Sequence, residues 1–420
     1  MEPICAISTP AGGALGMIRV SGDDAIGIVN HIFSKDISST PGYTAVHGSV
    51  GIDDVVIIVY RSPHSFTGED SVEIMCHGPA YIMQKTVEML CQQGCRLAHP
   101  GEYTQRAFLN GKMDLSQAEA VADLIASTSA ATHRLAMSQM RGGFSKELRS
   151  LREQLLEIKS LLELEIDFSE EDVEFADREK LLTLLTDTKQ KIHTLLTSFR
   201  AGNALRNGIP VVIAGETNVG KSTLLNRLLN EDRAIVSDVK GTTRDTIEEC
   251  ITIGDYRFRF IDTAGLRITN DMVEQMGIER SRKKIREAQI ILMMTEPGVP
   301  YPDVKVTEEQ IVIHIENKTP QFQALTGIGV DALKERLVKE AESLCHCDSD
   351  IVVTNLRHVE ALRKASQSVE QALSSLTSHL SSDIIALDLN DCITHLSEIT
   401  GDITSDEVLR NIFSHFCIGK

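Results

Sequence analysis

The loop GETNVGKS, from Gly215 to Ser222, constrains the fold more than any other feature of the sequence. It fits the pattern G-x4-G-K-[ST], directly follows the apolar run VVIA and directly precedes the helical run TLLNRLL. Glycines let the backbone curl, so that its N–H groups and the N-terminus of the helix face phosphate oxygens. Lys221 then neutralises the β- and γ-phosphates, and Ser222 binds Mg²⁺. The sequence therefore predicts a phosphate-binding strand, loop and helix.

Two further motifs follow in the order expected of a GTPase switch. GTTRD at 241–245 offers Thr243 as a second Mg²⁺ ligand and γ-phosphate sensor, and DTAG at 262–265 places Asp262 at the end of a strand near the metal. Many GTPases carry a glutamine after DTAG to position the attacking water, whereas this chain has Leu266. Hydrolysis must therefore be assisted differently.

The segment expected to read the base departs from the pattern of guanine readers. Asn317, Lys318, Thr319 and Pro320 stand where those proteins have N-K-x-D, whose carboxylate accepts hydrogen bonds from N1 and the exocyclic amine of guanine. Losing such charge-assisted bonds costs about 1.5–3 kcal/mol each. Two alternatives are open: guanine preference is weakened, or another carboxylate substitutes, for which Glu316 is the candidate by proximity in sequence.

Helical regions flank this α/β unit. Before it, the run VVIIVY at 55–60 predicts a strand and YIMQKTVEML at 81–90 a helix. Apolar residues spaced three and four apart then predict amphipathic helices: Leu148, Leu151, Leu155, Ile158 and Leu162, then Leu181, Leu185, Ile192, Leu195 and Phe199. The acidic segment DFSEEDVEF at 167–175 is interpreted as a solvated connection between them rather than a metal site.

From residue 209, strands alternate with helical segments, which is typical of a parallel α/β sheet. The strands expected are IPVVIAG, EECITIG, YRFRFIDT, QIILMMT and QIVIHIEN. After about 350 the helical period returns at Leu356, Val359, Leu362, Val369, Leu373, Leu376 and Leu380. The simplest interpretation is one helical domain with the α/β unit inserted. The predicted domains are 1–115, 116–205 (first helical part), 206–345 (inserted) and 346–420 (second helical part).

Composition excludes several classes of protein. No apolar run approaches the roughly 20 residues of a membrane helix, and MEPICAISTP lacks a cleavable signal pattern. The nine cysteines are an odd number spread along the chain, which favours reduced thiols and an intracellular setting. Neither Cys91-x3-Cys95 nor Cys345-His346-Cys347 has a second pair at zinc spacing. The net charge of −18 matches a phosphate backbone poorly, so nucleic acid requires a local basic patch or a partner.

Taken together, the phosphate loop, GTTRD, DTAGLR, STPAGGALGMIRVSG, HPGEYTQRAFLNGKMDLSQAEAVADLI and the final FCIGK resemble the tRNA wobble-uridine modification GTPases of the MnmE or TrmE family, over almost the full length. The resemblance implies a multidomain fold, α/β plus all-α. An N-terminal α+β folate-binding and dimerising domain is followed by a helical bundle domain, which a Ras-like P-loop GTPase domain interrupts.

The resemblance also implies a function. With a flavoprotein partner that carries FAD, called MnmG or GidA, such GTPases add an aminomethyl or carboxymethylaminomethyl group to carbon 5 of uridine 34 of certain tRNAs. A 5-formyl- or methylene-tetrahydrofolate supplies the carbon, and GTP hydrolysis with Mg²⁺ and K⁺ drives the conformational cycle. A cytoplasmic homodimer that forms a heterotetramer with the partner, binds tRNA and does not use a membrane is expected.

Residues are assigned to the folate site by the same resemblance: Arg19, Glu73, Lys112 and Lys420. A carboxylate can pair with the aminopyrimidine edge of a pterin, and cations can meet its glutamate tail. From pattern alone, Arg19 is a surface residue.

The resemblance further implies that the tail carries Cys417 to the folate pocket as a catalytic residue, since a thiolate is nucleophilic. From the residues alone, the alternative is that Phe413, Phe416 and Ile418 pack the last helix and that Cys417 is a small buried residue.

In the GTPase domain the resemblance implies a K⁺ ion held by Asn218, Ser237, Val239 and Thr242, and a catalytic, water-organising Glu274. On pattern alone, Glu274 is a solvated helical residue. The full set expected to bind GTP is Asn218, Val219, Gly220, Lys221, Ser222, Thr223, Ser237, Asp238, Val239, Lys240, Gly241, Thr242, Thr243, Asp262, Thr263, Ala264, Gly265, Asn317 and Lys318.

Two other functions compete with this one. A folate- and nucleotide-sensing regulatory scaffold would explain the changed base segment, but not the intact hydrolysis residues. A GTPase of ribosome assembly would share the phosphate loop, but would need neither FCIGK nor the N-terminal motif.

Overall fold

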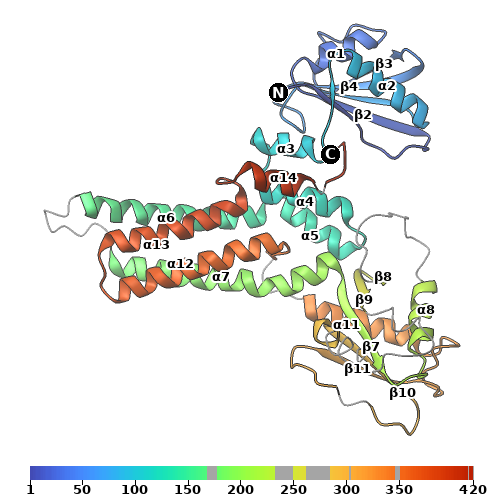
Figure 1. Cartoon of the computed structure of the whole chain (residues 1–420), viewed down its shortest axis with the longest axis vertical. Helices are drawn as coiled ribbons and strands as arrows, with labels where there is room; N and C mark the ends of the chain where they lie inside the picture. The colour runs from blue at the N-terminus through green and yellow to red at the C-terminus, as the bar shows by residue number, and fades with distance from the viewer. Residues whose placement is uncertain are drawn as a thin grey trace. The chain divides into compact units, whose positions relative to one another are not determined.

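A computed structural model describes residues 1–167, 177–231, 249–261, 284–301, 304–345, 351–414 and 416–419. The chain divides into two compact units (Figure 1). Unit 1 comprises residues 1–122, 140–156 and 393–420, and unit 2 comprises 123–139 and 157–392. None of the helices in the described part of the chain is long and apolar enough to cross a membrane.

Unit 1 is built on a six-stranded sheet with the order β3-β4-β5-β2-β1-β6. Its strands are β1 (Ile4–Ile7), β2 (Leu15–Ser21), β3 (Thr44–Val50), β4 (Asp53–Tyr60), β5 (Ser71–His77) and β6 (Arg96–Leu97). Neighbours are antiparallel except β1 and β6. Apolar residues alternate along β4 and β5, so one face packs against α1 (Ala25–Ile32) and α2 (Ala80–Gln92). The strand and the helix predicted at 55–60 and 81–90 are confirmed.

Shorter helices complete unit 1. Tyr103 of α3 (Glu102–Leu109) packs on β1. At the start of α4 (Leu115–Ala126), Leu115 forms a separate cluster with Phe413 of α14 (Asp406–Ser414). This cluster fixes α14, the last helix before the FCIGK tail, within unit 1. The tail therefore belongs to the unit of the six-stranded sheet.

Two long helices of unit 2 come from segments far apart in the chain. α7 (Arg178–Asn207) lies along α12 (Leu356–Thr377), with an ion pair of 3.0 Å between Lys189 and Glu370. The residues at the predicted spacing in α7 are mostly buried, whereas Leu356 and Leu380 are exposed. Asp177 begins α7 as a side-chain cap of the Glu179 and Lys180 amides. Three further helices, α5 (Ala130–Met140), α6 (Gly143–Asp167) and α13 (Ser382–Thr400), have residues in both units, as does α4.

The second sheet of the chain lies in unit 2, with the order β11-β10-β7-β9-β8. Its strands are β7 (Ile209–Gly215), β8 (Glu249–Ile253), β9 (Tyr256–Phe260), β10 (Ile290–Thr295) and β11 (Ile311–Glu316). The prediction of a parallel sheet is confirmed for β11, β10, β7 and β9. It is wrong for β8, which pairs antiparallel with β9. A two-residue turn at 254–255, with Gly254 at φ +58°, reverses the chain between these strands.

Helices α8 (Lys221–Glu231) and α11 (Val330–Cys345) contribute to one apolar core with this sheet. The predicted alternation of strand and helix fails between β10 and β11, because residues 296–301 and 304–310 contain no helix. Parallel strands are commonly joined by a crossover helix. Among the described residues, β11 pairs only with β10 and therefore forms an edge of the sheet.

Candidate functional site

The phosphate loop lies between β7 and α8, as the sequence predicts. Gly215 has φ +152°, and a Cβ added to it would lie 2.3 Å from the carbonyl oxygen of Met294 in β10. Gly220 has φ +97°, and its Cβ would lie 2.4 Å from Nδ2 of Asn317. Both positions therefore require glycine for conformation and for space.

Lys221 points back over this loop. Its Nζ donates to the carbonyl oxygen of Gly215 at 2.8 Å and to that of Glu216. Burial lowers the pKa of the Lys221 ammonium. An anion held by the loop would favour the charged lysine, so the arrangement suits a phosphate group.

Asn317 connects the base segment to the phosphate loop. Its buried Nδ2 donates to the carbonyl oxygen of Val219 at 2.8 Å, and its Oδ1 accepts from the amide of Ala324 at 3.0 Å. Lys318, with φ +64°, forms an ion pair with Glu296. The structure thus brings together two motifs that are about a hundred residues apart in the sequence.

Only some of the other residues predicted for this site lie among the described residues. Asn218 is exposed with φ +66°, and Ser222 and Thr223 lie partly buried in the first turn of α8. The following predicted residues lie outside the described residues: Ser237, Asp238, Val239, Lys240, Gly241, Thr242, Thr243, Asp262, Thr263, Ala264, Gly265, Glu274 and Lys420.

Unit 1 contains a separate cavity of about 140 Å³. Residues of β2, β4, β5, α3 and the connection between β4 and β5 line it: Arg19, Val20, Ser21, Tyr60, Phe66, Thr67, Ser71, Val72, Glu73 and Tyr103. Arg19 and Glu73 face each other in the register of β2 and β5, and their side chains form an ion pair of 2.8 Å. The hydroxyl of Tyr60 donates to the other Glu73 oxygen at 3.1 Å. Arg19 is therefore part of a cavity wall, not only a surface residue.

The tail after α14 runs beside this wall. The carbonyl oxygen of Gly419 accepts hydrogen bonds from Nη1 of Arg19 at 3.3 Å and from the hydroxyl of Ser8 at 3.2 Å. Gly419 has φ +91°, and a Cβ there would lie 2.5 Å from the carbonyl oxygen of Ile7. A glycine is therefore needed for this close approach.

The alternative that the tail residues simply pack against the last helix is right for Phe413 and wrong for Cys417 and Ile418. Phe413 is buried, with its ring 5.2 Å from that of Phe416, whereas Ile418 is 60% exposed and Cys417 is exposed. The thiol of Cys417 is thus accessible. Lys112 does not line the cavity, because its Nζ donates to the carbonyl oxygen of Pro63 at 2.9 Å.

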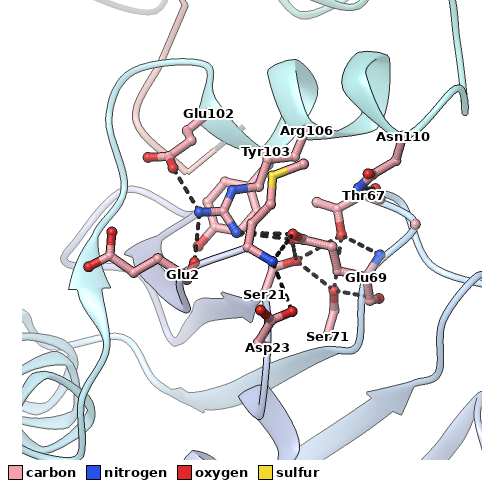
Figure 2. Close-up of polar contacts among 12 residues, drawn as sticks. Glu2, Ser21, Asp23, Thr67, Glu69, Ser71, Glu102, Tyr103, Arg106 and Asn110 are labelled. Carbon is pink, nitrogen blue, oxygen red and sulfur yellow. Dashed lines mark hydrogen bonds and ion pairs between the residues drawn. The ribbon is translucent and has the colours of Figure 1, made fainter.

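A buried ionic network, which was not predicted from the sequence, underlies the cavity wall. Figure 2 shows the Arg106 guanidinium between Glu102, at 2.9 Å, and Glu69, at 3.1 Å. Glu69 also accepts from the hydroxyl of Ser21, which in turn contacts Ser71. The Glu102-x3-Arg106 spacing on α3 was the one available signal.

This network perturbs Glu102 strongly. Burial alone would raise the pKa of its carboxyl group, but hydrogen bonds from Arg96, the amide of His99 and Arg106 outweigh it and lower the pKa to about 2. Glu102 therefore stays ionised and ties α3 to β6 and to the loop before α3.

The strand, glycine loop and lysine-bearing helix, joined to a base segment through Asn317, define a phosphate-loop nucleotide-binding protein. Comparison with known families is more specific. Residues 3–112 match the model described as "GTP-binding protein TrmE N-terminus", and residues 115–417 match "MnmE helical domain".

Curated relatives of the same family align with the whole chain. The tRNA modification GTPase MnmE of Bacteroides thetaiotaomicron is 50% identical, with 100% of this chain and 99% of the relative aligned. That of Parabacteroides distasonis is 51% identical, with 100% of both chains aligned, and that of Christiangramia forsetii is 46% identical, with 100% and 99% aligned. This chain belongs to the MnmE family. Its alignment with the first of these relatives runs over 462 positions, whereas the chain has 420 residues, so it lacks residues that the relative has.

Proposed function

We propose that this protein hydrolyses GTP and uses the hydrolysis in the modification of tRNA at carbon 5 of uridine 34. The observation that carries the proposal is the intact phosphate loop in a chain about 50% identical to named tRNA modification GTPases over its full length. The domains proposed are those of the family: residues 1–115, 116–205, 206–345 and 346–420.

Hydrolysis transfers the γ-phosphoryl group of GTP to water, which yields GDP and phosphate. Lys221 neutralises the β- and γ-phosphates, and its present partners are carbonyl oxygens that phosphate oxygens can replace. The Ser222 hydroxyl is a suitable Mg²⁺ ligand, with Thr243, and bound Mg²⁺ would neutralise developing charge on the phosphates. Asn218, with Ser237, Val239 and Thr242, would hold K⁺, and Glu274 would orient the water.

The cavity of unit 1 is the proposed tetrahydrofolate site, for the 5-formyl or methylene form. Glu73 can accept hydrogen bonds from an aminopyrimidine edge, and Arg19 already holds it in place. The exposed Cys417 thiol and Lys420 would come from the tail, whose Gly419 reaches Arg19. Lys112 would meet the glutamate tail of folate.

The proposed partners are a second copy of the chain, the FAD-carrying MnmG and tRNA, in the cytoplasm.

One observation favours a second function. Pro320 offers no side-chain acceptor to guanine, which suits a regulatory scaffold that binds folate and nucleotide without efficient turnover.

Steady-state hydrolysis of GTP in K⁺ and in Na⁺ separates the two functions. The wild-type protein should hydrolyse GTP faster in K⁺ than in Na⁺. Lys221→Ala and Glu274→Ala should each abolish GTP hydrolysis. Lys305→Ala, which removes an exposed lysine of the same unit, is the matched control and should act like wild type. Equal, negligible rates for wild type and Lys221→Ala would favour the scaffold.

A further inference from the structure

We infer that the open edge of the second sheet binds the same edge of a second copy of this chain, by antiparallel pairing of β11 with β11. The contact goes beyond the proposed function, which names a second copy as a partner but no surface for it. It is additional to the N-terminal dimerising domain that the family resemblance implies, and it does not require GTP hydrolysis. The backbone of β11, the order of its charges and the groove beside it support this contact.

Every second residue of β11 directs its backbone groups away from the sheet. The amide of Ile311 donates to the carbonyl oxygen of Gln289, the residue before β10, at 2.9 Å. Backbone direction alternates along a strand, so the odd-numbered residues of β11 bond towards β10 and the even-numbered residues face outwards. The outward residues are Val312, His314 and Glu316.

The outward backbone groups are almost unused within the described chain. Residues 304–345, which contain β11 and its neighbours in sequence, are all described. Among the described residues, the Thr319 hydroxyl donates to the carbonyl oxygen of Glu316 at 3.2 Å, and no other hydrogen bond reaches these outward groups. A carbonyl oxygen has two lone pairs, so that of Glu316 can accept a second hydrogen bond. The edge therefore keeps its capacity to pair with another strand.

The strand β11 lacks the features that usually protect an edge, which are charges spread along the strand, a proline or a bulge. Its sequence is IVIHIE, and it pairs with β10 in an unbroken register. Its first three residues are β-branched and apolar, and its ionisable side chains lie in the second half. These side chains can therefore select a partner strand without blocking the rest of the edge.

The order of His314 and Glu316 makes β11 complementary to itself. When two copies pair about a two-fold axis at Ile315, His314 of each copy lies opposite Glu316 of the other. Both side chains are exposed, and a histidine can donate to a carboxylate in either protonation state. An axis at His314 would instead place two histidines opposite each other and Glu316 opposite Val312. Cross-strand charge pairs therefore favour the axis at Ile315.

A groove of about 450 Å³ runs along the same edge, and its apolar lining includes Ile313, Phe322 and Leu333. The odd-numbered side chains of β11 face this side of the sheet, where Ile313 packs, partly buried, against the core. A two-fold axis perpendicular to the sheet at Ile315 keeps Ile313 of each copy on this side, opposite Asn317 of the other. Pairing would thus cover apolar surface as well as backbone groups.

Sedimentation velocity of the full-length protein over a range of concentrations measures self-association. His314→Pro removes an outward N–H group and leaves the hydrogen bonds to β10 in place. The mass of the largest assembly should fall by at least about half, because a proline at this position blocks pairing of the edge.

Exchange of the two ionisable side chains tests the register. His314→Glu places carboxylates opposite each other in both cross-strand pairs and should weaken association about tenfold. Adding Glu316→His re-forms the two pairs in reverse order and should restore association to within about threefold of wild type. Glu308→His, which makes the same change at an exposed residue outside β11, is the matched control and should have no effect.

Unchanged self-association in both His314→Pro and His314→Glu would overturn the inference and leave the proposed GTP hydrolysis untouched. Failure of the double exchange to restore association would overturn the pairing about Ile315. A wild-type protein that stays monomeric at every concentration would overturn both the inference and the second copy proposed as a partner.

Discussion

Replacing Glu102 with glutamine tests the buried ionic network beneath the cavity of unit 1. Glutamine keeps the size of the side chain but removes the charge that Arg96 and Arg106 share. Glu102 is 7% exposed, so solvent screens these interactions little. The variant should therefore lose most of the charge-dependent stabilisation.

The pKa of Glu102 supplies the magnitude and its dependence on pH. A decrease of the carboxyl pKa from its ordinary value of 4.5 to about 2 in the folded protein corresponds to about 3 kcal/mol of stability at pH 7. Because the folded pKa is the lower one, this stability is complete above the unfolded pKa. It is lost as the pH falls from about 4.5 towards 2, and at pH 3 it should be less than half as large.

Urea titrations at pH 7 and pH 3 measure this loss, with hydrogen exchange in the peptide containing β2 as a readout local to unit 1. Glu102→Gln should be less stable than wild type by about 3 kcal/mol at pH 7, and the difference should shrink at pH 3. Glu88→Gln, which removes an exposed ion pair with Lys85, should change stability by less than about 1 kcal/mol at both values. An equal loss at both pH values, or a loss below about 1 kcal/mol at pH 7, would refute the reasoning.

Two further predictions concern the candidate sites. Gly215→Ala should weaken nucleotide binding at least tenfold, because its Cβ would lie 2.3 Å from the Met294 carbonyl oxygen. Titration with a fluorescent GDP analogue measures the affinity, and a near-normal value would contradict the prediction. Tyr60→Phe should weaken tetrahydrofolate binding about fivefold by removing one hydrogen bond, worth about 1 kcal/mol, that orients Glu73; calorimetry measures this, and unchanged affinity would contradict it.

Local features of the structure were predictable from the sequence. The phosphate loop carries its own signature, and glycine is required at Gly215 and Gly220 by φ and by close neighbours. The buried residues of α7 likewise follow a period that a single helix imposes.

Features that depend on pairing between distant segments were not predictable. The Arg19–Glu73 ion pair arises from the register of β2 against β5. The resemblance to a family assigned both residues to one site, but neither it nor a pattern predicted the pair. The Arg106–Glu69 pair joins α3 to a loop 37 residues earlier. The antiparallel direction of β8 was not predicted, because the interpretation from residue 209 onward assumed that strands alternate with helices. The short turn at Gly254 instead joins β8 directly to β9.

The most direct test of the account is the nucleoside composition of tRNA from a bacterial strain that lacks its own MnmE and expresses this chain. Mass spectrometry would quantify uridine 34 modified at carbon 5. The account predicts that wild type restores the modified nucleoside and that Lys221→Ala, at equal abundance, does not. Unmodified uridine 34 in cells that contain folded wild-type protein and the flavoprotein partner would contradict it.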